Sequence, residues 1–142
     1  MAHAAARYLF AHMSTKNFSL TNKTRSPVPR VPFLAIKNAV LGEAYDLSLA
    51  LLTPAEATRV TQETKHKDKA SNVLSFPLSK TSGEILLCPA TARKECKDFS
   101  MTPREFLTYL FIHGLLHLRG LDHGATMERE ERRILTQFAP RA

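Results

Sequence analysis

The sequence predicts an α+β fold, in which a single mixed sheet of about four strands packs against helices. Segments with strand alternation and segments with helical spacing follow one another as strand, helix, strand, helix, strand, strand, helix, helix, helix. Residues 103–119 are apolar on nearly all sides, as expected of a buried central helix. The length of 142 residues suits one domain. We assign it to residues 17–142, behind a short basic arm at residues 1–16.

The first part of the domain contains two predicted strands and two predicted helices. Loose alternation over residues 17–24 predicts an edge strand. Apolar residues at helical spacing over 33–41 predict a helix, and the following glycine suits its end. Polar and apolar residues alternate over 45–51, which predicts a half-buried strand. The helix expected over 53–65 opens with Thr-Pro-Ala-Glu, a capping box with proline in the first turn.

The middle of the chain predicts two more strands and a short helix. Residues 72–76 are rich in strand-forming side chains, and we expect Pro77 to end that strand. A turn-rich link leads to a strand over 85–87, which a proline also ends, and a short helix is expected over 90–97.

Two helices complete the domain. The helix over 103–119 opens with a second capping box, Thr-Pro-Arg-Glu, and a glycine follows it. The last helix, over about 126–138, has one apolar face that includes Met127, which we interpret as a core methionine. The charged run over 128–133 is interpreted as its solvated face.

The net charge of +7 is concentrated near the start of the chain, because six basic residues and no acidic residue precede Glu43. A basic surface suits nucleic acid, although the same charge also suits simple solubility. The acid-free start also resembles a transit peptide, but it is short and weakly amphipathic. Two cysteines make no disulfide framework, no apolar run could span a membrane, and no secretory signal is evident. We therefore expect a cytoplasmic protein.

Three of the six histidines lie within eleven residues: His113, His117 and His123. His113 and His117 are four apart on a helix, so both imidazoles face one side. A glycine at 120 lets the chain leave the helix and return His123 to the same point. Three imidazoles with an open fourth position are typical of catalytic zinc, so we expect one Zn²⁺ per chain. Alternatives are three unrelated histidines, or a closed structural site completed by Cys88 or Cys96.

The spacing from His117 to His123 also resembles the metzincin proteases, which carry a glutamate directly after the first histidine. Here that position is Gly114, so the proton carrier for peptide hydrolysis is missing.

Three motifs give the chain a more specific resemblance. Residues 113–123 read HGLLHLRGLDH, which is close to the pattern H-G-x-L-H-L-x-G-x-D-H of one protein family. The fold around these residues would be zincin-like. Residues 67–76 read KDKASNVLSF, close to a segment ending in T-(D/N)-V-L-S-F-P. Residues 82–85 read SGEI, close to L-G-(D/E)-I. In this order the motifs resemble the YbeY family of endoribonucleases and ribosomal-RNA maturation factors, over about residues 17–135.

The resemblance implies a zinc-dependent hydrolase specific for single-stranded RNA. It would mature the 3′ end of ribosomal RNA of the small ribosomal subunit and act in ribosome quality control. The zinc ligands would be His113, His117 and His123, beside a basic groove. The family's active-site arginine aligns with Lys65, which keeps the charge but loses the bidentate contact to phosphate.

We expect Lys65 to act in catalysis and Lys65, Lys67 and Lys69 to contact RNA, although these lysines would also suit a solvated loop. Zinc would acidify a bound water and polarise a phosphodiester oxygen. Asp122 either orients a histidine from behind or is a turn residue.

Glu84 is either an acid that supports the metal ligands from behind or an ordinary surface residue, and we favour the second. Ser75 faces either the site or the sheet. Two other functions stay open: another metal-dependent hydrolase, and a non-catalytic ribosome-binding factor with structural zinc. The oligomeric state also stays open.

Overall fold

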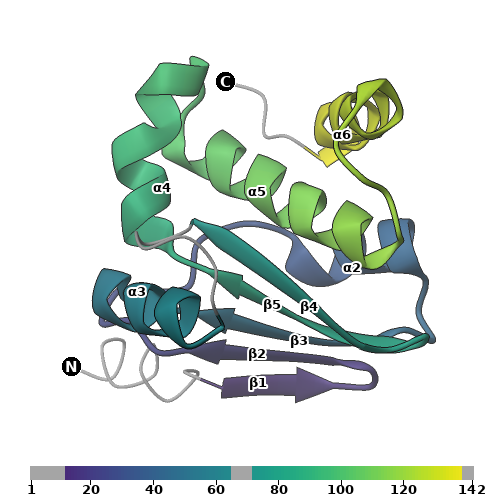
Figure 1. The fold of residues 1–142 in the computed structure, drawn as a ribbon, viewed down its shortest axis with the longest axis horizontal. Coiled ribbons are helices and arrows are strands. Elements are labelled where there is room, and N and C mark those ends of the chain that lie inside the picture. Colours follow the sequence, from purple (N-terminus) through teal and green to yellow (C-terminus); the bar gives the residue numbers. More distant parts are fainter. Residues whose placement is uncertain (1–11, 65–71, 139–142) are drawn as a thin grey trace.

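The computed structural model describes residues 12–64 and 72–138. Over these residues the chain forms one mixed five-stranded sheet with helices on both faces (Figure 1). The predicted α+β class is therefore confirmed, and the three histidines lie on and just after a long, mostly buried helix.

The sheet has the order β1-β2-β3-β5-β4. Its three central strands β2, β3 and β5 are parallel, and the two edge strands β1 and β4 are antiparallel to their neighbours. The strands are β1 His12–Thr15, β2 Phe18–Asn22, β3 Asp46–Leu51, β4 Val73–Ser79 and β5 Ser82–Leu87.

Both edges of the sheet differ from the sequence prediction. Residues 12–15, expected in the basic arm, form β1, so β2 is an inner strand and not the edge. Pro77 does not end its strand, because β4 continues to Ser79 with a register shift. A proline lacks the N–H for a ladder bond, and only an edge strand such as β4 tolerates this loss.

The helices begin and end close to the predicted residues. Both predicted capping boxes are present, with Thr53 at the start of α3 and Thr102 at the start of α5. The helices are α2 Phe33–Leu41, α3 Pro54–Glu63, α4 Pro89–Glu95, the 3₁₀ turn η1 Cys96–Phe99, α5 Pro103–Leu118 and α6 Ala125–Phe138.

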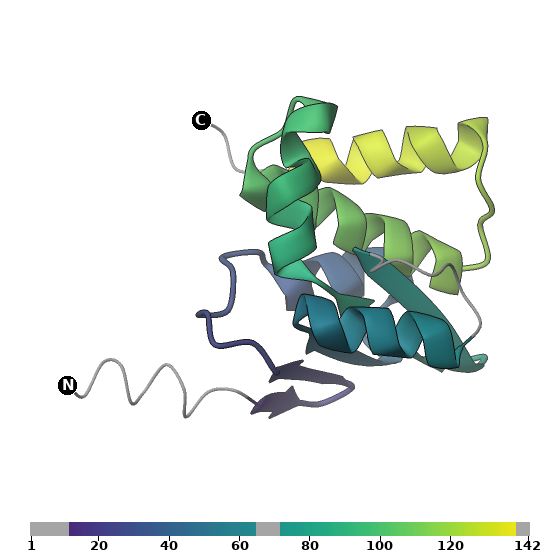
Figure 2. The same ribbon diagram turned by 60° about the vertical axis from the view of Figure 1, so that its left-hand side comes forward.

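The alternating side chains of the sheet serve two separate apolar clusters. Leu47, Leu49 and Ile85 face α2 and α5 in the main core, which α6 joins through Met127 and Ile134. On the opposite face a smaller cluster packs around Ala57 of α3. Figure 2 shows α5 and α6 on one side of the sheet, with α5 nearer to it. Helix α5 is thus held between sheet and helix, which makes it a rigid base for a site.

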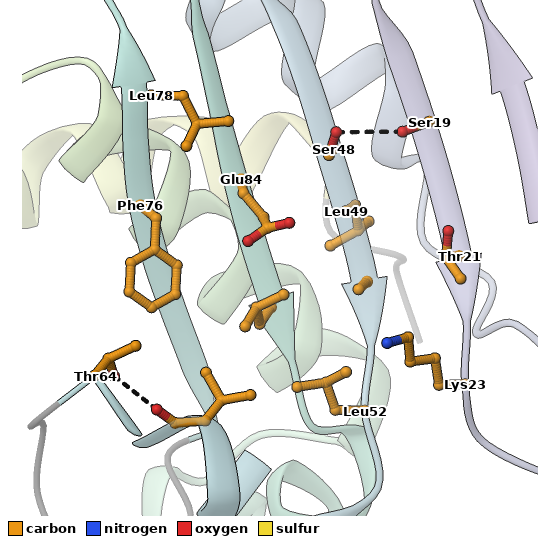
Figure 3. Close-up of a pocket in the computed structure, with 13 residues that line it drawn as sticks. Ser19, Thr21, Lys23, Ser48, Leu49, Leu52, Thr64, Phe76, Leu78 and Glu84 are labelled. Carbon is orange, nitrogen blue, oxygen red and sulfur yellow. Dashed lines mark hydrogen bonds between the residues drawn. The ribbon is translucent and has the colours of Figure 1, made fainter. Parts of the chain in front are cut away.

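The α3 side of the sheet also carries an open hollow of about 650 Å³. Serine, threonine and leucine side chains line it, with the Glu84 carboxylate near its centre and Lys23 at one end (Figure 3). Glu84 thus lies on the face of the sheet away from α5, as expected of a residue without a part in the histidine cluster. Among the described residues no helix is both long and apolar enough to cross a membrane.

Candidate metal centre

The three histidines gather at the C-terminal end of α5. His113 and His117 project from the last turns of α5, and His123 lies in the link to α6. One nitrogen from each ring lies within 4.8 Å of the other two, and the Nε2 atoms of His113 and His117 are 3.1 Å apart. Three imidazole nitrogens at this separation are a donor set that suits a divalent transition metal.

The end of α5 returns the chain toward these rings. Gly120 has a φ of 100°, a left-handed conformation that favours glycine. Its N–H donates to the carbonyl of His117, and the N–H of Leu121 donates to the carbonyl of Leu116. This pair of bonds is a Schellman motif, which satisfies the last carbonyls of the helix and turns the chain back. His123 reaches the other two rings because of that turn.

Burial favours the neutral form of the central imidazole. The pKa of His117 is lowered mainly by burial, and further by the positive charge that His113 and His123 acquire when protonated. A hydrogen bond with the Leu121 backbone and the charge of Asp122 raise the pKa of His117. A neutral ring keeps the lone pair that a metal ion needs, so the site is prepared to bind metal at neutral pH.

A buried carboxylate orients His113 from behind. Nδ1 of His113 lies 2.5 Å from Oε2 of Glu131 on α6, and Glu131 is only 6% exposed. With Nδ1–H donating to this carboxylate, the lone pair of His113 is on Nε2, which faces the other histidines. The interpretation of residues 128–133 as a solvated face is therefore wrong for Glu131. The sequence holds a signal for this burial, because Glu131 lies at helical spacing between Met127 and Ile134, and all three share the buried face of α6.

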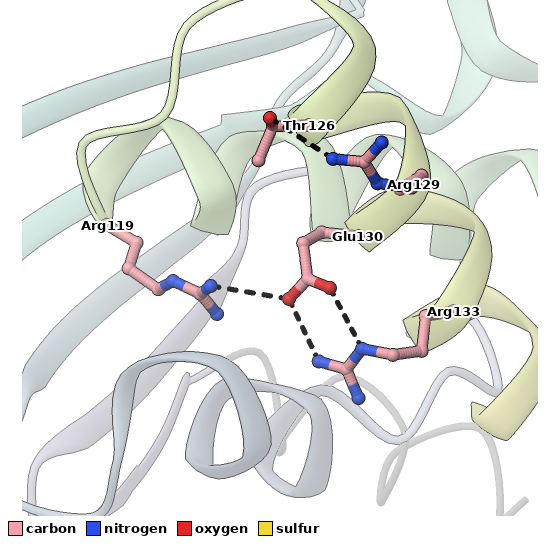
Figure 4. Close-up of polar contacts among 5 residues, drawn as sticks. All are labelled: Arg119, Thr126, Arg129, Glu130 and Arg133. Atoms are coloured by element: carbon pink, nitrogen blue, oxygen red, sulfur yellow. Dashed lines mark hydrogen bonds and ion pairs between the residues drawn. The ribbon is translucent and has the colours of Figure 1, made fainter.

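The neighbouring Glu130 ties the two helices together at the surface. Its carboxylate accepts two bonds of 3.0 Å from Arg133 and one of 3.3 Å from Arg119, at the end of α5 (Figure 4). These contacts, above all the hydrogen bond from Arg133, lower the pKa of Glu130 to about 2. The Arg119 contact joins the end of α5 to α6 at the surface of the protein.

Gly114 lets α5 approach the sheet closely. A Cβ at this position would lie 2.9 Å from Oγ of Ser75 and 3.2 Å from Ile85 and Val73 side-chain carbons. Oγ of Ser75 instead donates to the Gly114 carbonyl over 3.0 Å, so Ser75 faces the helix from the sheet. A glutamate at 114 would point into this packed contact, so the chain has no room for the metzincin base.

The other predicted residues lie in different places. Lys65, Lys67 and Lys69 fall outside the described residues, just after α3. Asp122 is exposed, makes no hydrogen bond within the described part of the chain, and does not contact His113 as Glu131 does. Cys88 and Cys96 are free and buried, and neither belongs to the histidine group, which argues against a closed site completed by cysteine.

A family comparison identifies the chain. The sequence profile described as "Endoribonuclease YbeY" matches residues 12–139. The chain belongs to the YbeY endoribonuclease family. It is 31% identical over 154 residues to "Endoribonuclease YbeY" of Neisseria meningitidis serogroup B, covering 91% of this chain and 90% of that protein. It is 28% identical over 135 residues to the YbeY endoribonuclease of Francisella philomiragia, covering 84% and 85%.

A solved structure shares the fold of this chain. The solution structure of TM1509 from Thermotoga maritima superimposes with a TM-score of 0.58 at 23% identity, over 74% of this chain and 77% of that one. As a YbeY-family member the chain is an endoribonuclease, a metal-dependent hydrolase, and its histidine cluster has a geometry consistent with a metal site.

Proposed function

We propose that this chain is a zinc-dependent, cytoplasmic endoribonuclease that cleaves single-stranded RNA and matures the 3′ end of small-subunit ribosomal RNA. The observation that carries the proposal is the group of three imidazole nitrogens within 4.8 Å of one another, in a chain of the YbeY family. A role in ribosome quality control and contact with the small ribosomal subunit belong to the same proposal, and they rest on the family resemblance.

The donor set favours zinc as the metal. His113, His117 and His123 would hold it, and three neutral nitrogen ligands leave a position for water and substrate. When bound, zinc supplies a Lewis acid that lowers the pKa of a water molecule and offsets negative charge on phosphate oxygens. Glu131 contributes by keeping the proton on Nδ1 of His113, so that Nε2 is free to bind.

Basic residues of the chain would place the RNA backbone. Lys65, Lys67 and Lys69 follow α3 in the sequence and, as in the family resemblance, would contact phosphates beside the histidines. Lys65 stands at the family's arginine position and would offset the charge that develops in the transition state. Because an ammonium group lacks the planar pair of donors of a guanidinium, we expect Lys65→Arg to raise the cleavage rate.

One experiment tests both the metal and the reaction. Tag-free protein is analysed for bound zinc and for cleavage of single-stranded RNA carrying the small-subunit 3′ end. His117→Ala should lose zinc and cleavage, whereas His12→Ala, which changes an exposed histidine on β1, should keep both. Lys65→Ala should keep zinc but cleave more slowly than Lys80→Ala, its control on the β4–β5 turn.

The outcomes are distinct. Zinc that restores cleavage to stripped wild type supports the proposal. Full zinc occupancy with the same trace cleavage in every variant would point to a contaminant and to a ribosome-binding role. Absence of zinc from the wild type would refute the metal assignment.

A further inference from the structure

Three arginines from separate parts of the sequence surround one pocket near the start of α5, at the opposite end of this helix from the histidines. Arg30 lies in the link between β2 and α2, Arg93 lies on α4, and Arg104 lies in the first turn of α5. Three prolines and Leu107 complete a hollow of about 270 Å³. Figure 2 shows that the β2–α2 link and α4 lie on the same side of the molecule.

No acidic residue in the described part of the chain balances the positive charge of this pocket. No acidic residue lines it, and none of the three arginine side chains makes a hydrogen bond or ion pair with a described residue. Nearby acids are engaged elsewhere, because Glu105 caps α5 and Glu95 accepts a 2.6 Å bond from Asn72. Three like charges around one hollow repel one another, and a bound anion would relieve that repulsion.

We propose that this arginine pocket binds a phosphate of the single-stranded RNA backbone, at a distance from the cleavage site. Guanidinium groups bind phosphate oxygens in pairs, and the proline and leucine walls offer apolar surface to an attached sugar or base. The pocket is slightly smaller than typical ligand cavities of about 300–1,000 Å³, so it suits one nucleotide and not a folded RNA. The inference rests on RNA being the substrate.

The distance along α5 between the arginine pocket and the histidines determines which RNAs can contact both. Arg104 precedes His113 by nine residues, which corresponds to about 14 Å along the helix and about half a turn around it. At about 3.4 Å per stacked nucleotide, a stacked RNA covers this rise with about four nucleotides. A dinucleotide substrate therefore reaches the histidines without the pocket, and a long substrate reaches both.

Salt-dependent RNA binding tests the proposal. The combined variant Arg30→Gln/Arg93→Gln/Arg104→Gln is compared with Lys16→Gln/Lys80→Gln/Arg132→Gln, which removes the same charge from exposed positions elsewhere. Binding of a single-stranded RNA of about 16 nucleotides to metal-loaded protein is measured by fluorescence anisotropy at several salt concentrations. Gel analysis of each sample detects any cleavage, and only samples in which the RNA is intact are used.

The pocket variant should bind at least about tenfold more weakly at low salt. Its slope of log K against log salt should fall by about 0.7, the change expected when one phosphate contact on a single strand is lost. The control should change the slope far less. Replacing the three arginines with lysine should restore the slope but only part of the affinity, because lysine keeps the charge without paired donors.

Several results separate the possible failures. Equal slopes in the pocket variant and the control would overturn the proposal. Binding of inorganic phosphate that disappears in the pocket variant, without a change in the RNA slope, would mean a small-anion site and would overturn it too. Unchanged cleavage of a dinucleotide by the pocket variant supports two separate contacts. If no protein cleaves RNA, the proposed function fails, and the salt slope still reports on the pocket.

Discussion

Replacing Glu131 with glutamine removes the carboxylate behind His113 while keeping the side-chain volume. The wild-type contact joins a 6% exposed carboxylate to Nδ1 of His113 at 2.5 Å. Glutamine can still accept from Nδ1–H, but a hydrogen bond to a neutral acceptor is about half as strong as one to a carboxylate. His113 would therefore be oriented less firmly, and its Nε2 would be a weaker donor to a metal ion.

The expected loss follows from similar carboxylate–histidine pairs. Removing the partner of a metal-binding histidine costs about 10- to 100-fold in metal affinity. We expect Glu131→Gln near the lower end and Glu131→Ala near the upper end, or about 1.4–2.7 kcal/mol. The metal-free protein should respond differently, because removing a buried carboxylate also removes the cost of its desolvation. Its free energy of unfolding should change little or increase.

The assay is a zinc competition titration combined with urea unfolding of the metal-free and zinc-loaded protein. At saturating zinc, a tenfold weaker Kd lowers the stabilisation by about 1.4 kcal/mol. Glu128→Gln is the matched control, since it removes the same charge one turn earlier on α6 at an exposed position. This control should leave zinc affinity within about twofold of wild type.

Two results would refute this reasoning. If Glu131→Gln binds zinc as tightly as Glu128→Gln, the contact does not orient His113 for a metal. If Glu131→Gln destabilises the metal-free protein by several kcal/mol, the carboxylate acts mainly in the packing of α6 on α5.

Three further predictions concern stability. Gly114→Ala should destabilise the fold by about 0–2 kcal/mol, since overpacking costs about 1–3 kcal/mol and the higher helix propensity of alanine offsets about 1 kcal/mol. In urea unfolding, adding Ser75→Ala should relieve part of this cost. Purely additive effects of the two substitutions would contradict the close contact. Thr102→Ala removes the cap of α5 and should cost about 1 kcal/mol without changing zinc affinity, whereas an unchanged Tm would contradict the capping role. The pKa of Glu130 is lowered from 4.5 to about 2, so its stabilising contribution is complete above pH 4.5 and disappears as the pH falls toward 2. The stability difference between wild type and Glu130→Gln should shrink over that range, and a difference independent of pH would contradict the ion pair.

Local patterns in the sequence were sufficient to predict the helices and the histidine group. The capping boxes at Thr53 and Thr102 and the glycine at 120 mark helix ends through hydrogen bonds to residues only a few positions away. His113 and His117 share a face because the helical period alone places residues four apart together. The motifs around them also indicated the YbeY family, which the profile match confirms.

Other features depended on partners that are distant in sequence. Pro77 lies within a strand because β4 is an edge, and strand order follows from non-local pairing that no short window contains. Gly114 is required because Ser75, 39 residues away, approaches the helix from β4. Glu131 lies beside His113 only because α6 folds back onto α5. The sequence by itself determined which side chains could serve chemistry, and the tertiary structure decided which of them meet, because burial and contact arise only when separate elements pack together.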